Sequence, residues 1–260
     1  MELELKKECL DTYELGEPQT LTQEETAETI VPDYCPDIAR IISAEGVVCL
    51  HGGTEQDGVT GTVRVTVLYT PENESGVRAL EFAMPFSAQG EGLAGCAHVV
   101  VETEIELLES RMLNPRKIFT RCKLVTHLAG CRKVCLTISS DAETDPALLV
   151  EKRCCGQTVS LLRQVAEKDL TFSETMSLSL GREGAAELLH CRANGIVTET
   201  KAIGNKLIFK GVFLVSALYR TTGGQLASAS AELPFSQIME TDSTEENTQV
   251  SMRLRITGTD

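Results

Sequence analysis

Residues 59–69 read VTGTVRVTVLY, and the alternation in this stretch decides the fold class. Every second residue is apolar or glycine, and the residues between them are polar or charged over most of the stretch. Successive side chains of a β-strand point to opposite faces, so the pattern predicts a strand with one face in a core and the other in water. We therefore expect a mainly β protein.

The same stretch occurs twice in the chain. Residues 46–69, GVVCLHGGTEQDGVTGTVRVTVLY, align with residues 195–219, GIVTETKAIGNKLIFKGVFLVSALY, with one residue of length difference at the turn. The tetrapeptide at 84–87 then falls on that at 233–236, and the alternating residues of 101–107 fall on 250–256. A repeat of about 150 residues has the length of a whole domain. We predict two tandem β-rich domains, residues 1–140 and 147–260, each a sandwich or an open barrel.

Turn residues divide each copy into hairpins. Gln56-Asp57-Gly58 and Gly204-Asn205 precede the long strands, and residues that tolerate positive φ are needed to reverse a twisted hairpin tightly. Asn114-Pro115 predicts a further turn, and Pro85, which cannot donate to a ladder, is expected at a strand end or sheet edge. The polar stretch Ser139–Pro146 reads as the interdomain linker.

One short helix is expected in each domain. In 36–44, Pro36 suits the first helical turn, and Ile38, Ile41 and Ile42 form an i, i+3, i+4 stripe. Its counterpart is 183–191, in which Ala185, Leu188 and Leu189 are predicted to face the core.

The second copy is shorter than the first. After Ile105 the first copy continues through about two further strands, whereas the second ends at Asp260 shortly after Ile256. We expect the second domain to be incomplete, with its closing strands absent. An unpaired β edge recruits another strand, so the chain is either a fragment of a longer protein, which we prefer, or is completed by a partner, including self-association through this domain.

Composition limits the classes of partner. The net charge of -14 disfavours nucleic acid and anionic membranes. The chain has no Trp and only 4% aromatic residues, so few side chains can stack on nucleic-acid bases or sugar rings. The N-terminal residues MELELKKECLDTYEL hold no apolar run long enough for a signal peptide or membrane span, so we expect a cytoplasmic protein whose ten cysteines are reduced.

No motif carries an obvious chemistry. Cys131 and Cys135 with the pair at 154–155 could hold zinc, but the spacing is not that of a standard knuckle. Four scattered histidines, 51, 98, 127 and 190, lie in no recognised nucleophile motif, and the alternating Glu102, Glu104 and Glu106 are typical of a solvated strand face. We predict a non-enzymatic protein with no catalytic, cofactor-binding or metal-ligating residues and no cofactor.

Three segments carry a family resemblance. They are 30–38, IVPDYCPDI, the Pro-Phe-Ser strand end at 85–87, and 113–118, LNPRKI. Together they resemble the SPOCS domain of Clostridia-type spore-formers, a domain of unknown function met in tandem copies and sometimes followed by a LysM module. The resemblance covers nearly all of residues 1–135. It is weaker in the second copy, where 178–186 has lost the V-P-D-Y-x-P-D-I block, and the 260 residues contain no LysM-like segment.

The resemblance implies a sporulation protein of the mother-cell cytoplasm, at the forespore surface. There it would act as a non-catalytic scaffold or adaptor in spore coat and cortex assembly, with a coat-morphogenetic ATPase as its expected protein partner. Asp33, Tyr34 and Asp37 are the candidate docking patch, a Tyr anchor rimmed by charge. We prefer the structural explanation of this block, in which Pro32 and Pro36 steer the chain into a helix with Tyr34 packed beside the sheet. A different class of function, a module that binds a small molecule or cell-wall glycan, also stays open.

Overall fold

The computed structural model describes residues 4–51, 58–143, 151, 153, 155–156, 158–174, 184–242 and 248–258. These residues form strands and connecting segments and contain no helix, so the prediction of a mainly β protein is confirmed. No segment of the described residues is a helix long and apolar enough to cross a membrane. The strands are β1 (Glu4–Leu15), β2 (Gln19–Ile30), β3 (Ile38–His51), β4 (Gly58–Pro71), β5 (Arg78–Gln89), β6 (His98–Asn114), β7 (Lys117–Glu143), β8 (Ala185–Ile203), β9 (Lys206–Thr221) and β10 (Leu226–Glu240).

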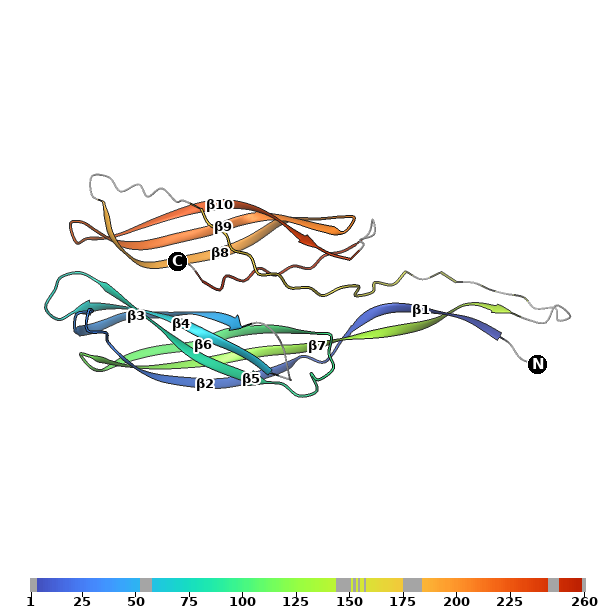
Figure 1. The fold of residues 1–260 in the computed structure, drawn as a ribbon, viewed down its shortest axis with the longest axis horizontal. Coiled ribbons are helices and arrows are strands. Elements are labelled where there is room, and N and C mark those ends of the chain that lie inside the picture. Colours follow the sequence, from blue (N-terminus) through green and yellow to red (C-terminus); the bar gives the residue numbers. More distant parts are fainter. Residues whose placement is uncertain are drawn as a thin grey trace.

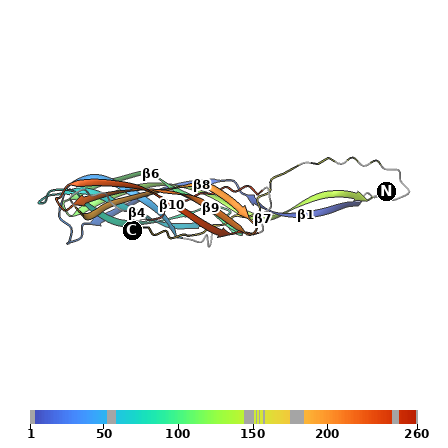
Figure 2. The same ribbon diagram turned by 90° about the horizontal axis from the view of Figure 1, so that it is seen from above.

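All strand pairings are antiparallel and form three sheets. β7 pairs with β1, β2 and β6, and the other two sheets have the orders β3-β4-β5 and β10-β9-β8. The first half of β7 carries β2 and β6, while its second half pairs with β1 alone as a two-stranded arm that projects from the body (Figures 1 and 2).

The β3-β4-β5 sheet packs face to face on the sheet of β7. The inward residues of β4 and of β7 fill one core: Val63, Val65 and Val67 from the former, Ile118, Cys122 and Leu124 from the latter, all at most 1% exposed. Alternation at 59–69 therefore gives the predicted buried face, and this part of the chain is a sandwich. The β8-β9-β10 sheet lies beside it (Figure 1).

The repeat in the sequence is visible in strand pairing. Gly61 lies opposite Phe86 between β4 and β5, and Gly211 lies opposite Phe235 between β9 and β10. A Cβ at either glycine would overlap the ring of that phenylalanine, so both copies use glycine to let the ring lie flat across the strand. Of the predicted turns, Gly204, at φ 61°, reverses the chain between β8 and β9, and Asn114-Pro115 joins β6 to β7. Pro85 lies in the sheet-edge strand β5, as expected. Of the turn at 56–58, residues 56 and 57 lie outside the described residues.

Both predicted helices are wrong. Residues 38–44 belong to β3 and residues 185–191 to β8, while Glu183 lies outside the described residues. The helix-like spacing comes from β-bulges, at Ile38/Arg40 and Ile41/Ser43 in β3 and at Ala185/Glu187 and Leu188/His190 in β8. An extra residue in a bulge returns the chain to the same face after three residues instead of two. Of the three residues predicted to face the core of the second copy, Leu189 is buried, but Ala185 and Leu188 are exposed.

The predicted linker is also wrong over its first half. Residues 139–143 continue β7 and pair with β1, with Ser139 opposite Lys7, and residues 144–146 lie outside the described residues. Residues 135–141 of β7 are all exposed, so their sequence has no reason to alternate and reads as a loop. The domain boundaries at 140 and 147 remain a prediction.

Candidate functional site

The residues of the V-P-D-Y-C-P-D-I block form a tight loop between β2 and β3. Val31 and Ile38, at its two ends, are fully buried. Within the loop the Cys35 amide donates to the Pro32 carbonyl at 2.9 Å, which closes a turn that brings Tyr34 to the tip. The two buried ends hold the loop on the sandwich, while Asp33 and Tyr34 between them are exposed.

Arg116 organises this loop from the β6–β7 turn. One guanidinium nitrogen donates to the carbonyl of Cys35 at 2.8 Å and to the Asp37 carboxylate at 3.0 Å. The other donates to the carbonyl of Val31 at 2.9 Å and to the Asp33 carboxylate at 3.0 Å. A planar fork with several fixed donors suits such convergent acceptors, which lysine could not satisfy together.

Backbone bonds complete the junction of loop and turn. The Val31 amide donates to the Arg116 carbonyl, and the Ile38 amide to the Pro115 carbonyl, both at 2.9 Å. The turn itself is fixed by the Asn114 side chain, which accepts from the Arg116 amide at 2.9 Å. The loop and the turn thus form one hydrogen-bonded unit, although about 80 residues separate them in the sequence.

The three candidate docking residues divide into two roles. Tyr34 is 88% exposed, so the expectation that its ring packs beside the sheet is wrong. Asp33 is also fully exposed while one of its oxygens meets Arg116. Asp37 turns back towards Arg116 with about half of its side chain covered. The structure therefore places Asp33 and Tyr34 together on the surface, with Asp37 as part of their support.

Sequence reasoning missed Arg116. It lies in the 113–118 segment that supports the family resemblance, and no role was predicted for it. The available signal was electrostatic, because two aspartates four residues apart in a proline-held loop attract a nearby cation, and the segment 113–118 contains one arginine beside a turn.

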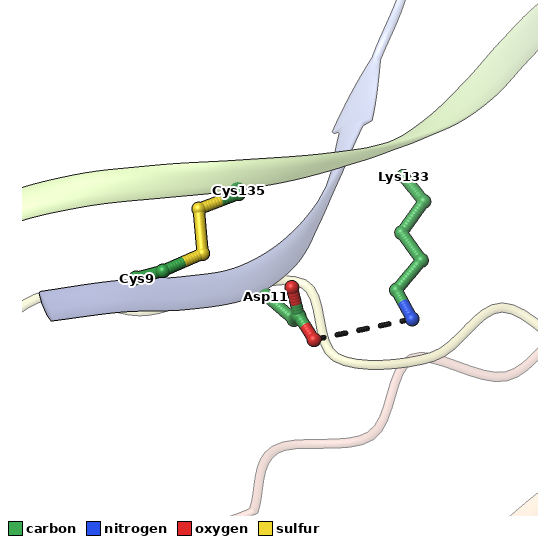
Figure 3. The surroundings of a disulfide bond; sticks show 4 residues. All are labelled: Cys9, Asp11, Lys133 and Cys135. Carbon is green, nitrogen blue, oxygen red and sulfur yellow. Dashed lines mark ion pairs between the residues drawn. A yellow bond between two sulfur atoms is a disulfide. The ribbon is translucent and has the colours of Figure 1, made fainter.

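Two of the described cysteines are joined to each other. Cys9 and Cys135 form a disulfide between β1 and β7, with Cα atoms 5.6 Å apart (Figure 3), so the expectation of reduced thiols throughout is wrong for this pair. Asp11 and Lys133 face each other at 4.0 Å on the same arm. Cys131, Cys122 and Cys49 remain free. Burial raises the pKa of each, to about 11 at Cys122, which disfavours the thiolate that a nucleophile or metal ligand requires.

The candidate zinc and carboxylate groups are likewise dispersed. Cys154 lies outside the described residues, and Cys155 is an exposed free thiol. No group of three or more His, Cys, Asp or Glu within the described ranges could hold a metal ion. Of the alternating glutamates of β6, Glu102 pairs with Arg253 and Glu106 pairs with Lys123 at 2.8 Å, in keeping with a solvated strand face.

The four histidines stand on four strands: His51 on β3, His98 on β6, His127 on β7 and His190 on β8. His51 and His127 contact the threonine hydroxyls of Thr62 and Thr20, and His190 Nε2 lies 3.1 Å from a Glu45 oxygen. His98 packs its ring beside Tyr13, with 5.8 Å between the ring centroids. These contacts set the histidines against hydroxyl groups, a carboxylate and an aromatic ring, and none of the four involves a cysteine.

A surface hollow with a volume of about 730 Å³ lies between β3 and the adjoining ends of β6 and β7. The only aromatic side chain among its described lining residues is Phe119, and the guanidinium of Arg111 lies over that ring at 4.9 Å. An aromatic floor for a sugar ring would need a free face, which Phe119 does not offer on that side. The lining residues are Glu24, Ile41, Ile42, Ser43, Ala44, Leu108, Glu109, Ser110, Arg111, Phe119 and Arg121.

Ion pairs connect the sandwich to the third sheet. One Glu187 oxygen on β8 accepts from Arg78 of β5 at 3.1 Å and from Arg220 of β9 at 2.7 Å. These side chains are partly exposed, so the junction is polar and its stabilisation is modest.

Comparison with known proteins gives one match. Residues 185–260 match the family model described as SipL, SPOCS domain. This segment contains β8, β9 and β10, and confirms from the second copy the resemblance that the first copy carries most plainly. No curated protein and no solved structure matches the chain.

Proposed function

We propose that this chain, whose residues 185–260 are a SPOCS domain, is a non-catalytic adaptor in spore envelope assembly that presents the loop at 31–37 to a protein partner. The observation that carries the proposal is the exposure of Tyr34, at 88%, on a loop that Arg116 holds in one conformation. A large exposed aromatic ring on a pre-ordered loop is a suitable anchor, because little conformational entropy is lost when it binds.

The charge of the chain supports a protein partner with a basic surface. The net charge is -14, and Asp33 stands fully exposed beside the Tyr34 ring. Complementary charge around an aromatic anchor speeds association and orients the complex. The partner that we propose is a coat- or cortex-morphogenetic ATPase, and the place of action is the mother-cell cytoplasm at the forespore surface, as the family resemblance implies.

Catalysis has no support among the described residues. The free buried thiols have raised pKa values, and the histidines stand apart from one another. We therefore propose that the protein acts by binding alone.

Affinity capture from a lysate of sporulating Clostridia-type cells tests the proposal. Tagged wild-type chain, Tyr34→Ala and Leu226→Ala are compared, with the ATPase identified and quantified by mass spectrometry. Leu226 is an exposed apolar residue on β10 and serves as the matched control. We expect Tyr34→Ala to reduce recovery at least tenfold, about 1.4 kcal/mol, and the control to recover as much as wild type. Equal recovery by all three chains, or no recovery of the ATPase by any, contradicts the proposal.

A further inference from the structure

The arm formed by β1 and the second half of β7 has little buried surface of its own. β1 pairs with β7 out to Glu4 opposite Glu143, whereas β6 pairs with β7 only as far as Cys131. Beyond that point the described residues add no third strand to the ribbon. Its residues 5–9 and 135–141 are all exposed. A two-stranded ribbon without a packed face is marginally stable in water, so the arm needs another source of order.

The disulfide between Cys9 and Cys135 supplies a covalent link between the two strands. It joins residues that are 126 apart in the sequence, with Cα atoms 5.6 Å apart (Figure 3). The ion pair beside it, between Asp11 and Lys133, has 4.0 Å between its charged atoms, and its side chains are 68% and 63% exposed. Such an exposed pair contributes little to stability. The disulfide is therefore the strongest single link between β1 and β7 in the arm.

Both cysteines of this link are open to reagents in solution. Cys9 and Cys135 are exposed, whereas the neighbouring Cys131 is buried and its pKa is raised by burial. Disulfide exchange requires a thiolate to reach a sulfur atom, so an exposed disulfide is reduced more readily than a buried one. Cys131 stays protonated and competes poorly in the exchange. The exposed pair can thus open and close without exchanging with this buried thiol.

β1 also carries the attachment of a later segment to the arm. The carbonyl of Leu162 accepts from the Tyr13 amide at 2.8 Å and from the Thr12 hydroxyl at 3.0 Å. Thr12 is 6% exposed, so this is a covered contact in a ribbon that is otherwise largely solvated. Among the described residues, the hydrogen bonds that join 158–174 to the arm both start from β1.

The same segment, 158–174, then crosses to the third sheet (Figure 1). Lys168 donates to the Ile238 carbonyl of β10 at 3.0 Å, and the Phe172 ring packs on Phe213 of β9 with 4.9 Å between centroids. One part of the segment is thus attached to β1 and another to the β8-β9-β10 sheet. The contacts with β1 require its strand conformation, so loss of the pairing between β1 and β7 removes them too.

We propose that the Cys9–Cys135 disulfide is a redox latch, closed when oxidised, whose reduction by a dithiol releases β1 from β7 and detaches 158–174 from the arm. In the opening step one thiolate of the dithiol attacks a disulfide sulfur, and its second thiol then displaces the mixed disulfide. Two electrons pass to the protein, the two thiol protons of the reductant end on Cys9 and Cys135, and the reductant leaves as a disulfide. The cytoplasmic location proposed above fits a transient, redox-sensing disulfide better than a permanent cross-link. The latch goes beyond the adaptor role and does not depend on the 31–37 loop.

Hydrogen exchange on the purified full chain, with and without dithiothreitol, tests the proposal. The amides compared are those of residues 5–15 in β1 and of 206–221 in β9, which serve as the internal control. Alkylation followed by mass spectrometry reports which cysteines are thiols in each sample. We expect dithiothreitol to convert Cys9 and Cys135 to thiols. Exchange in 5–15, including the Tyr13 amide, should then accelerate at least about tenfold more than exchange in 206–221.

Two variants complete the design. Cys9→Ser cannot close the latch, so its residues 5–15 should exchange at the rate of reduced wild type and should not respond to dithiothreitol. Cys155→Ser removes an exposed free thiol outside the arm and should behave as wild type in both conditions.

Three results overturn the proposal. The first is slow exchange in 5–15 after both cysteines have been alkylated as thiols. The second is equal acceleration in 5–15 and 206–221, which would show that reduction loosens the whole chain and not the arm. The third is alkylation of Cys9 and Cys135 in air-oxidised chain without reductant, which would show that they do not pair. Each measurement is made without a protein partner, so failure of the latch is distinct from loss of capture through Tyr34.

Discussion

Replacement of Arg116 with alanine removes the side chain that holds the 31–37 loop, and the resulting loss of stability can be estimated from its contacts. Two of the four hydrogen bonds go to the carbonyls of Val31 and Cys35, and two go to carboxylates. A hydrogen bond from a charged donor contributes about 1.5–3 kcal/mol when buried, whereas an exposed ion pair contributes about 0–1 kcal/mol. The Arg116 side chain is 34% exposed and Asp33 fully so, which places the carbonyl bonds at the lower end and makes the Asp33 pair negligible. We expect Arg116→Ala to lower the free energy of unfolding by about 2–3 kcal/mol.

The assay is guanidinium denaturation followed by circular dichroism, together with hydrogen exchange at two amides. Those of Val31 and Ile38 donate to the carbonyls of Arg116 and Pro115, so they report the junction directly. A loss of about 2 kcal/mol in local stability accelerates their exchange about 30-fold, while amides of β9 should be unaffected. Exchange separates a local opening from a change in the whole chain.

Two matched variants serve as comparisons for the loss of stability in Arg116→Ala. Arg116→Lys keeps the charge but has no planar fork, so it should recover less than half of the loss. Arg121→Ala removes a single partly exposed pair with Glu24, at 2.7 Å, and should change stability by no more than about 1 kcal/mol. The role of Arg116 in the loop is contradicted if Arg116→Ala is as stable as Arg121→Ala, or if Arg116→Lys has the free energy of unfolding of wild type.

Three further outcomes are expected. Burial raises the pKa of Tyr69 to about 12, so the unfolded chain loses a proton that the folded chain keeps between about pH 10 and 12. The free energy of unfolding is unaffected below this window and falls within it by about 2–3 kcal/mol. Between pH 9 and 11.5, Tyr69→Phe should therefore lose less stability than wild type. Equal losses in the two chains would contradict a raised pKa of Tyr69. Gly61→Ala and Gly211→Ala should each lower the free energy of unfolding, measured by denaturant titration, by about 1–3 kcal/mol or more, because the new methyl group meets a phenylalanine ring and a backbone carbonyl. Wild-type stability in both variants would show that the rings move aside. The Cys9–Cys135 disulfide closes a separation of 126 residues, so reductant should destabilise wild type by up to about 5 kcal/mol and leave Cys9→Ser unchanged; an identical response to reductant would show that the thiols are not paired.

The strands were predictable where one face is buried. Alternation at 59–69 identified β4 and its buried side, since every second residue there meets the core. In β3 the alternation is interrupted by bulges, because an extra residue gives Ile38 and Ile41 the spacing of a helix. β-branched isoleucines favour strands, and this preference was the available argument for the correct assignment.

The candidate site was predictable in its residues but not in its arrangement. Its aspartates and Tyr34 were identified from a proline-rich block, but prolines fix only the local backbone and do not say whether a ring points to the core or to water. Tyr34 is 88% exposed on a loop that Arg116 contacts from about 80 residues away in the sequence. Contacts between such distant segments leave no periodic signal in one sequence, so charge complementarity was the only available clue.

The two copies differ in the carboxylates that Arg116 contacts. Arg116 belongs to the β6–β7 turn, so a loop with Asp33 and Asp37 is held in place only where a β7 strand follows β6. Without the arginine, two carboxylates four residues apart would repel each other with no cation between them. Residues 178–186, the corresponding stretch of the second copy, contain no aspartate, so the pair of carboxylates that Arg116 contacts in the first copy is absent from that stretch.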